Sequence, residues 1–163
     1  MLAKLSRGDY AELPGTQVEV ARLAALFGDQ AITKLTRADA SKERLDELRR
    51  AGGLKKYRYL HLATHGVAND VRAFESALIL ARPAKQPEPC VGQPCLDGRL
   101  TAGEVLEYWK LDAQLVTLSA RESGLGRKGG GDGLLGFAQA FLLAGSRSVC
   151  LSLGQVDDTA TAL

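Results

Sequence analysis

The sequence lacks any apolar run that approaches about 18 residues, the length at which a run becomes a candidate membrane-spanning helix. Its opening, MLAKLSRGDY, is too short and too polar for a secretory signal peptide. Only three cysteines occur among 163 residues, and this odd number agrees with a reducing compartment. We therefore expect no membrane partner and a cytoplasmic location.

A strong charge of either sign is also missing. Lysine and arginine total 21, aspartate and glutamate total 19, and the net charge is +2. Charges of both signs are interspersed along LTRADASKERLDELRR, which indicates a solvated helix and not a basic face. Nucleic acid is therefore not an expected partner.

Signatures of bound metals and phosphates are absent as well. Cys90 and Cys95 flank VGQP and could form a local disulfide if oxidised, or half of a metal site with His61 and His65. No second closely spaced cysteine pair exists to complete a zinc site. The glycine-rich run GLGRKGGGDG contains no G-K-[ST] phosphate loop, and a flexible loop on the substrate side accounts for it better. We predict no metal and no cofactor.

What the chain does contain is an alternation of helix and strand patterns. Its length indicates one domain, which we place at residues 13–163 after a polar lead-in over 1–12. Helical spacing of apolar residues predicts helices at 16–27, 41–51, 101–109 and 134–144. Short apolar runs predict strands at 31–35, 57–63, 75–81, 115–119 and 148–153. This order predicts an α/β fold, a three-layer α/β/α sandwich around a mainly parallel sheet.

Local signals refine the helices. TQVE at 16–19 and TAGE at 101–104 have the pattern of a capping box, in which a hydroxyl and a carboxylate satisfy the first amides of a helix. LLGFAQAFLLA, residues 134–144, is apolar almost all round, so we expect this helix to be buried on two sides.

Two strand ends form the candidate site, because ligands of α/β sheets bind beyond the carboxyl ends of the strands. One strand leads to His65 and Gly66, and the other is LVTLSARESGLG, residues 115–126. His61 lies inside the first strand, and we expect its side chain to be packed and hydrogen-bonded. His65 follows the expected strand end beside a glycine that permits close backbone approach, so it is the better catalytic candidate.

Five blocks, in chain order, resemble the CHAT domain, a caspase-like and separase-like cysteine peptidase fold. The blocks are HLATHG, DGRLTAGEV, LSARESGLG, GDGLLGFAQAFLLAGSRSV and QVDD. The resemblance runs from about Leu13 to the last residue. It implies that His65 is the general base, that the amides of Gly66 and residue 121 form the oxyanion hole, and that residue 121 is the nucleophile. The family has cysteine there, in an S-A-C-E-[ST]-G motif, whereas this chain has Arg121.

Arginine cannot replace the cysteine chemically, because a guanidinium has no acceptor and effectively never loses its proton. Ser119 and Ser123 lie two residues to either side, which displaces a side chain along a strand by about 6–7 Å. Cys150 is expected inside a buried strand. Arg121 itself has two interpretations: an ion pair with Glu122, Asp157 or Asp158, or a cation that lets the site bind acidic peptides without cleaving them.

The resemblance also implies an acidic substrate pocket, for which Asp157 and Asp158 are candidates together with Glu122. Capping of a helix that starts at 157 is an equally good explanation of the two aspartates. Relatives usually continue with another helix and further strands, so the chain looks truncated at its C-terminus. An apolar face left uncovered there would favour a homo-oligomer or aggregation.

These observations favour a peptidase-like domain that no longer cuts peptide bonds and that binds a peptide or protein, or serves as a scaffold. The alternative is an active cysteine endopeptidase whose natural form carries cysteine at position 121. A nucleotide-binding or phosphate-binding α/β module is a weaker third class.

Overall fold

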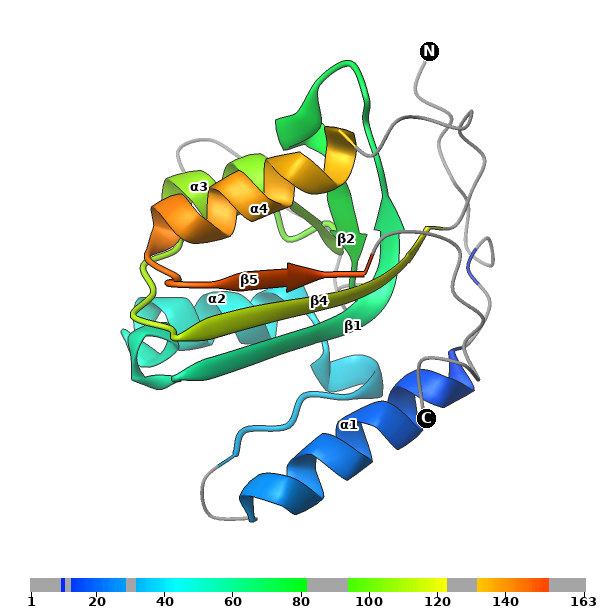
Figure 1. The fold of residues 1–163 in the computed structure, drawn as a ribbon, viewed down its shortest axis with the longest axis vertical. Helices are drawn as coiled ribbons and strands as arrows, with labels where there is room; N and C mark the ends of the chain where they lie inside the picture. The colour runs from blue at the N-terminus through cyan, green and yellow to red at the C-terminus, as the bar shows by residue number, and fades with distance from the viewer. Residues whose placement is uncertain (1–9, 11–12, 29–31, 82–93, 123–131, 153–163) are drawn as a thin grey trace.

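The computed structural model describes residues 10, 13–28, 32–81, 94–122 and 132–152, with the backbone alone at 121–122 and 132–134. Within these ranges five strands form one sheet in the order β3-β2-β1-β4-β5 (Figure 1). The strands are β1 (Tyr59–Val67), β2 (Ala77–Ile79), β3 (Arg99–Thr101), β4 (Leu115–Glu122) and β5 (Val149–Leu151). β1, β4 and β5 are parallel, and β2 and β3 add two antiparallel strands at one edge. The predicted α/β class with a parallel centre is confirmed.

Four α-helices accompany the sheet: α1 (Pro14–Phe27), α2 (Lys42–Arg50), α3 (Ala102–Tyr108) and α4 (Asp132–Ala144). α3 and α4 lie on one face of the sheet and α1 lies on the other (Figure 1). α2 packs next to α3, where the guanidinium of Arg49 lies 5.9 Å from the centre of the Tyr108 ring. This is the three-layer arrangement that the sequence predicts.

The core lies almost entirely between the sheet and the layer that contains α3 and α4. On β4, Val116 and Leu118 are 0% and 1% exposed, and α4 places Phe141 against them at 0%. Because successive strand residues point to opposite faces, the residues between these belong to the α1 side. None of the residues of α1 is buried. The two faces of the sheet are therefore very unequally covered by the described residues.

The helix boundaries show which local signals were reliable. The box at Thr101 and Glu104 caps α3 as predicted, and Ser41 caps α2 by accepting a hydrogen bond from the amide of Arg44. The box predicted at 16–19 is wrong, because α1 already begins at Pro14. Proline has a backbone angle suited to the first helical turn and no amide hydrogen that needs a cap there.

Three strand predictions need correction. No strand forms over residues 32–35, where Thr33 instead contacts the hydroxyl of Tyr57 at 2.6 Å. β3 was not predicted, because a strand of three residues is too short to show the alternation of apolar and polar residues typical of a strand. β1 and β4 both run further than expected, to Val67 and Glu122, because β2 pairs with residues 65–67 and the two long strands pair with each other up to residue 122. His65 therefore lies inside β1 and not after its end.

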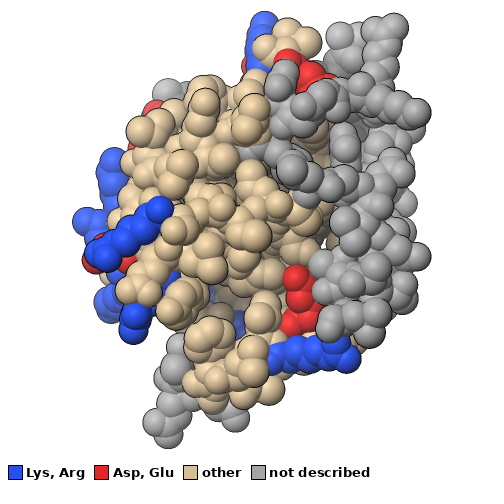
Figure 2. All heavy atoms as spheres, viewed as in Figure 1, with Lys and Arg blue, Asp and Glu red and all other residues tan. Residues whose placement is uncertain are grey.

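The prediction that α4 is buried on two sides is wrong. Phe137, Ala140, Phe141 and Ala144 face the core, whereas Leu135, Leu142 and Leu143 are 57%, 48% and 70% exposed. Figure 2 views this side of the molecule, where uncharged residues form a broad surface. In the described ranges, no helix is long and apolar enough to cross a membrane.

Candidate functional site

The strand register brings the two halves of the predicted site together. β1 and β4 are parallel neighbours, and His65 is the register partner of Arg121. Neighbouring strands lie about 4.8 Å apart, and register partners belong to the same face of a sheet. Both positions lie within the last three residues of their strands, so they meet at the carboxyl ends, where α/β proteins place their ligands. The two positions that the resemblance assigns to a base and a nucleophile are therefore neighbours at one edge of the sheet.

Gly66 has a packing role that is independent of substrate. It lies in β1 between Leu78 of β2 and Glu122 of β4. A Cβ atom at Gly66 would lie 3.3 Å from the Cβ of Ala120, closer than most such contacts. Glycine at this position therefore lets a neighbouring strand residue pack tightly, and its predicted oxyanion role stays a prediction.

The half-buried side chain of His65 contacts an aromatic ring from the N-terminal part of the chain. The centroids of the Tyr10 and His65 rings are 5.3 Å apart, with 44° between their planes. This lies within the range of favourable aromatic pairs. Nothing in the spacing of the sequence predicted this contact, because 55 positions separate the two residues.

Four residues before His65 along β1, His61 is part of a polar cluster that ties α1 to the sheet. The Nε2 atom of His61 lies 3.1 Å from Oε1 of Glu19, and its Nδ1 atom lies 3.1 Å from the Thr117 hydroxyl. The Ser119 hydroxyl donates to Oε2 of Glu19 at 3.4 Å. We call Glu19, His61, Thr117 and Ser119 the Glu19 clasp. The expectation that His61 is packed and hydrogen-bonded is confirmed.

Burial lowers the pKa of His61 below its ordinary value of 6.5, and the nearby Glu19 carboxylate partly offsets this effect. The imidazole is therefore neutral near pH 7. The Thr117 hydroxyl that contacts Nδ1 also donates to the carbonyl oxygen of Leu60 at 3.3 Å, which fixes its position between the two strands. His61 serves as a structural link in this arrangement.

Ser119 is badly placed to act as a nucleophile with His65. Its register partner is Ala63, two residues before His65, and its hydroxyl is directed to Glu19 of α1. Ser123, Asp157 and Asp158 lie outside the described residues, and at Glu122 the backbone alone is described, as the last residue of β4. The substrate-binding roles predicted for Asp157, Asp158 and Glu122 stay predictions.

The cysteines differ from expectation in one respect. Cys150 is an exposed, free thiol on β5, not a buried one, because it belongs to the lightly covered α1 face of the sheet. Its register partner is Thr117, so it lies at the level of His61 and not of His65. Cys95 is disulfide-bonded, which agrees with the local-disulfide alternative, and Cys90 lies outside the described residues.

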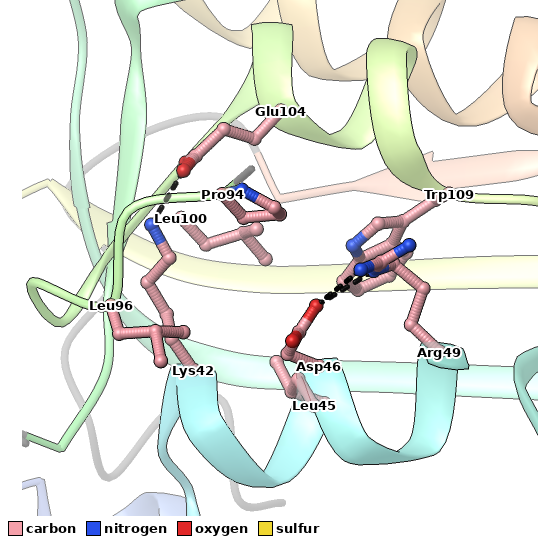
Figure 3. Close-up of a pocket in the computed structure, with 9 residues that line it drawn as sticks. All are labelled: Lys42, Leu45, Asp46, Arg49, Pro94, Leu96, Leu100, Glu104 and Trp109. Atoms are coloured by element: carbon pink, nitrogen blue, oxygen red, sulfur yellow. Dashed lines mark hydrogen bonds and ion pairs between the residues drawn. The ribbon is translucent and has the colours of Figure 1, made fainter. Parts of the chain in front are cut away.

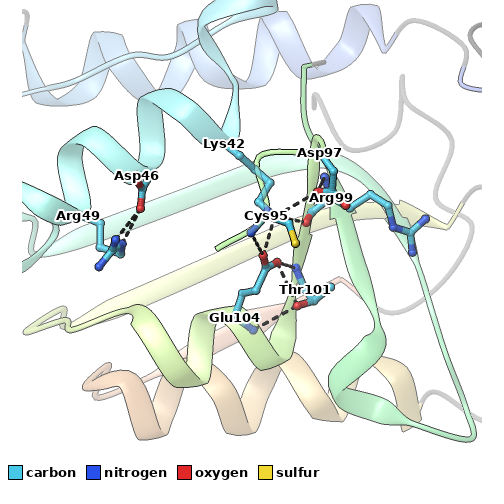
Figure 4. A network of polar contacts seen from close by, with 8 residues as sticks. All are labelled: Lys42, Asp46, Arg49, Cys95, Asp97, Arg99, Thr101 and Glu104. Carbon is cyan, nitrogen blue, oxygen red and sulfur yellow. Dashed lines mark hydrogen bonds and ion pairs between the residues drawn. The ribbon is translucent and has the colours of Figure 1, made fainter. Parts of the chain in front are cut away.

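A second polar group was not found from the sequence. Lys42, 3% exposed at the start of α2, donates to the carbonyl oxygen of Arg99 at 2.6 Å and to Oε1 of Glu104 at 2.7 Å. Asp97 accepts from the same ammonium at 3.2 Å (Figure 4). A shallow pocket beside it lies between α2 and α3, with Trp109 near Arg49 (Figure 3). Every proton of the lysine has a protein partner, so we assign this group to stability.

In the described part of the chain, a mainly parallel central sheet is flanked by helices on both faces, an architecture consistent with a caspase-like fold. Within that class the family is specific. The family model described as CHAT domain matches residues 2–163, nearly the whole chain, and this protein belongs to the CHAT domain family. Searches of curated proteins and of solved structures give no match.

Proposed function

We propose that this domain keeps the peptide-binding site of a CHAT peptidase but does not cleave peptide bonds, and acts as a binding or scaffold module. The observation that carries the proposal is the register of His65 with Arg121 on adjacent parallel strands. The position that pairs with the base is the position that the family's motif gives to the nucleophilic cysteine. In this chain that position is an arginine.

The chemical reason is specific. In a cysteine peptidase the imidazole takes the thiol proton, the thiolate attacks the peptide carbonyl, and the imidazole then protonates the departing amine. A guanidinium offers five donors and no lone pair for attack, so an acyl-enzyme cannot form on Arg121. The nearest described hydroxyl on the same strand, that of Ser119, is engaged with Glu19. These facts support loss of cleavage in the chain as given.

The same substitution favours a particular ligand. Residue 121 is a permanently charged arginine, and its backbone lies at the carboxyl ends of β1 and β4. Guanidinium groups bind carboxylates with two parallel hydrogen bonds. We therefore expect acidic peptides, or peptide C-terminal carboxylates, to bind better than neutral ones.

The alternative is an active cysteine endopeptidase whose natural form has cysteine at position 121. It is favoured by the backbone at this position, which lies one strand spacing from His65 in the arrangement that a thiol and an imidazole need. The two hypotheses differ in whether the substitution is natural, and both predict that Arg121→Cys creates a nucleophile beside the base.

Cleavage of a peptide library tests both. The variants are the chain as given, Arg121→Cys, and Arg121→Cys combined with His65→Ala. Arg147→Cys is the matched control, because it introduces a thiol at an exposed arginine on the loop before β5. We expect cleavage by Arg121→Cys alone. Cleavage by the chain as given would refute the inactive state, and activity of Arg147→Cys would assign the signal to a non-specific thiol.

Binding is tested separately with the same library on the chain as given and on Arg121→Ala. Preferential retention of acidic peptides, lost in Arg121→Ala, supports the binding role. If no peptide binds to either protein and Arg121→Cys does not cleave, the peptide site is not functional and the proposal fails.

A further inference from the structure

The face of the sheet that carries His65 is covered lightly. On the opposite face Val116 and Leu118 are almost completely buried, whereas Tyr59 on the α1 side is 47% exposed. Among the described elements, α1 provides the helical cover on this side, and none of its residues is buried (Figure 1). A segment with so little buried apolar area can detach without unfolding the core.

α1 is nevertheless fixed in register over the sheet. The Glu19 clasp joins the middle of the helix to His61 on β1 and to Ser119 on β4. At the end of the helix, the rings of Phe27 and Tyr59 lie 5.7 Å apart. These two attachments hold α1 over the sheet, so that Tyr10, close to the helix start in the sequence, has a high effective concentration at the strand ends.

The group that reaches the site is Tyr10, four residues before α1 begins. Its ring packs on the ring of His65 at 5.3 Å. Its hydroxyl is buried and makes no hydrogen bond within the described part of the chain. A buried hydroxyl without a partner is unfavourable, so the contact is driven by the ring and not by the polar group.

We propose that the surface against His65 is a side-chain subsite for an aromatic residue of a bound peptide, and that Tyr10 occupies it in the free protein. The inference rests on the proposed peptide-binding function and adds to it a ligand class, a peptide with an aromatic side chain. It also adds a condition for binding, since such a peptide displaces Tyr10. The apparent affinity is then the intrinsic affinity multiplied by the fraction of molecules in which Tyr10 has left the subsite.

Carbethoxylation with diethyl pyrocarbonate, located by mass spectrometry, tests the occupant without any peptide. The chain has two histidines, so His61 serves as an internal reference. We expect Tyr10→Ala to raise the modification rate of His65 by roughly 2- to 10-fold, the factor that an aromatic pair contributes, and to leave His61 unchanged. Tyr10→Phe is the matched control and should behave as the wild type, because it keeps the ring.

Three outcomes would overturn the proposal. One is an unchanged His65 rate in Tyr10→Ala, and another is a Tyr10→Phe variant that behaves like Tyr10→Ala. The third is an equal rise at both histidines, which would mean that the variant loosens the whole face. Glu19→Ala serves as the reference for this third outcome, because it should release α1 and raise the modification rate at both histidines.

The ligand class is tested with p-cresol, the side-chain analogue of tyrosine, on Tyr10→Ala. We expect saturable shifts of the His65 ring resonances that reverse those caused by the mutation, and weaker shifts in the wild type. Equal binding of cyclohexanol would refute an aromatic subsite. Failure of the general peptide-binding function is distinguishable, because it would leave the p-cresol and labelling results intact while no library peptide binds to Tyr10→Ala.

Discussion

Replacement of Lys42 by methionine should destabilise the domain by about 2–4 kcal/mol, because it removes the cation from a buried charge network. The side chain is 3% exposed and its ammonium contacts Glu104, Asp97 and the carbonyl oxygen of Arg99. Methionine fills a similar volume, so the perturbation is mainly electrostatic.

The magnitude follows from what each partner loses. Removal of one member of a buried ion pair typically costs about 3–5 kcal/mol. Glu104, 16% exposed, keeps the amides of Thr101 and Cys95 as donors, which reduces the cost. Asp97 is 40% exposed and is solvated by water, so its contribution is about 0–1 kcal/mol. The carbonyl of Arg99 loses a buried donor, which adds to the cost.

Urea unfolding measures the effect, with circular dichroism and the fluorescence of the one tryptophan as probes. With a urea m-value of about 2 kcal/mol/M, the midpoint should fall by roughly 1–2 M. Arg44→Met is the matched control, because the Arg44–Glu47 pair is 54% and 62% exposed and should change stability by less than about 0.5 kcal/mol.

A double-mutant cycle separates charge from volume. Glu104→Gln retains a capping side chain for α3, and the combination with Lys42→Met should cost less than the sum of the single variants by about 1–3 kcal/mol. A Lys42→Met variant as stable as the wild type, or strictly additive costs, would refute the assignment of this network to stability.

Two further predictions follow from the packing and the titration of specific residues. Gly136→Ala should lower stability by about 1–3 kcal/mol in the same urea assay, because the new Cβ would overlap the carbonyl oxygen of Ala73. This cost should exceed the gain from the higher helix propensity of alanine. An unchanged urea midpoint would contradict this packing. His61 should titrate below 6.5 by NMR, and Glu19→Gln should lower its pKa further, since the carboxylate is the group that raises it. Because the unfolded state binds this proton more readily, the contribution of His61 to stability is largest above the unfolded pKa of 6.5. The free energy of unfolding should fall by at most about 1.4 kcal/mol per pH unit as the pH drops from 6.5 to the folded pKa. His61→Gln should remove this slope.

The parts of the fold that the sequence predicts are those fixed by local chemistry. Helix α3 begins at its capping box, and helix α1 ends at Gly28, whose φ of +74° favours glycine. The pairing of position 65 with position 121 could be anticipated because the carboxyl ends of parallel strands meet at one edge of a sheet. The resemblance of five ordered blocks assigned the family, which composition and periodicity alone do not identify.

The parts that it misses depend on partners far away in the chain. Ser119 and Glu19 are 100 residues apart, and the periodicity of α1 places Glu19 near a helix start without indicating that it reaches across to two strands. β1 extends through His65 because β2 pairs with it there. The length of a strand cannot be predicted until the strands that pair with it are known. The exposed leucines of α4 were missed for the same reason. An apolar helical sequence shows which residues could be buried, but it does not show which of them another element covers.

The unequal faces of the sheet indicate that position 121 can be substituted without loss of the fold. Ala120 is 7% exposed and faces the core, so the next position, 121, belongs to the lightly covered side by alternation. A substitution at position 121 therefore changes the face of the sheet opposite the Val116 and Leu118 packing, on the side of α1, where no residue of that helix is buried. Substitutions at position 121 and substitutions in the core therefore act on separate faces. Arg121→Cys should accordingly fold with a urea midpoint close to that of the wild type, and absence of cleavage by that variant would reflect the chemistry of the site and not an unfolded protein.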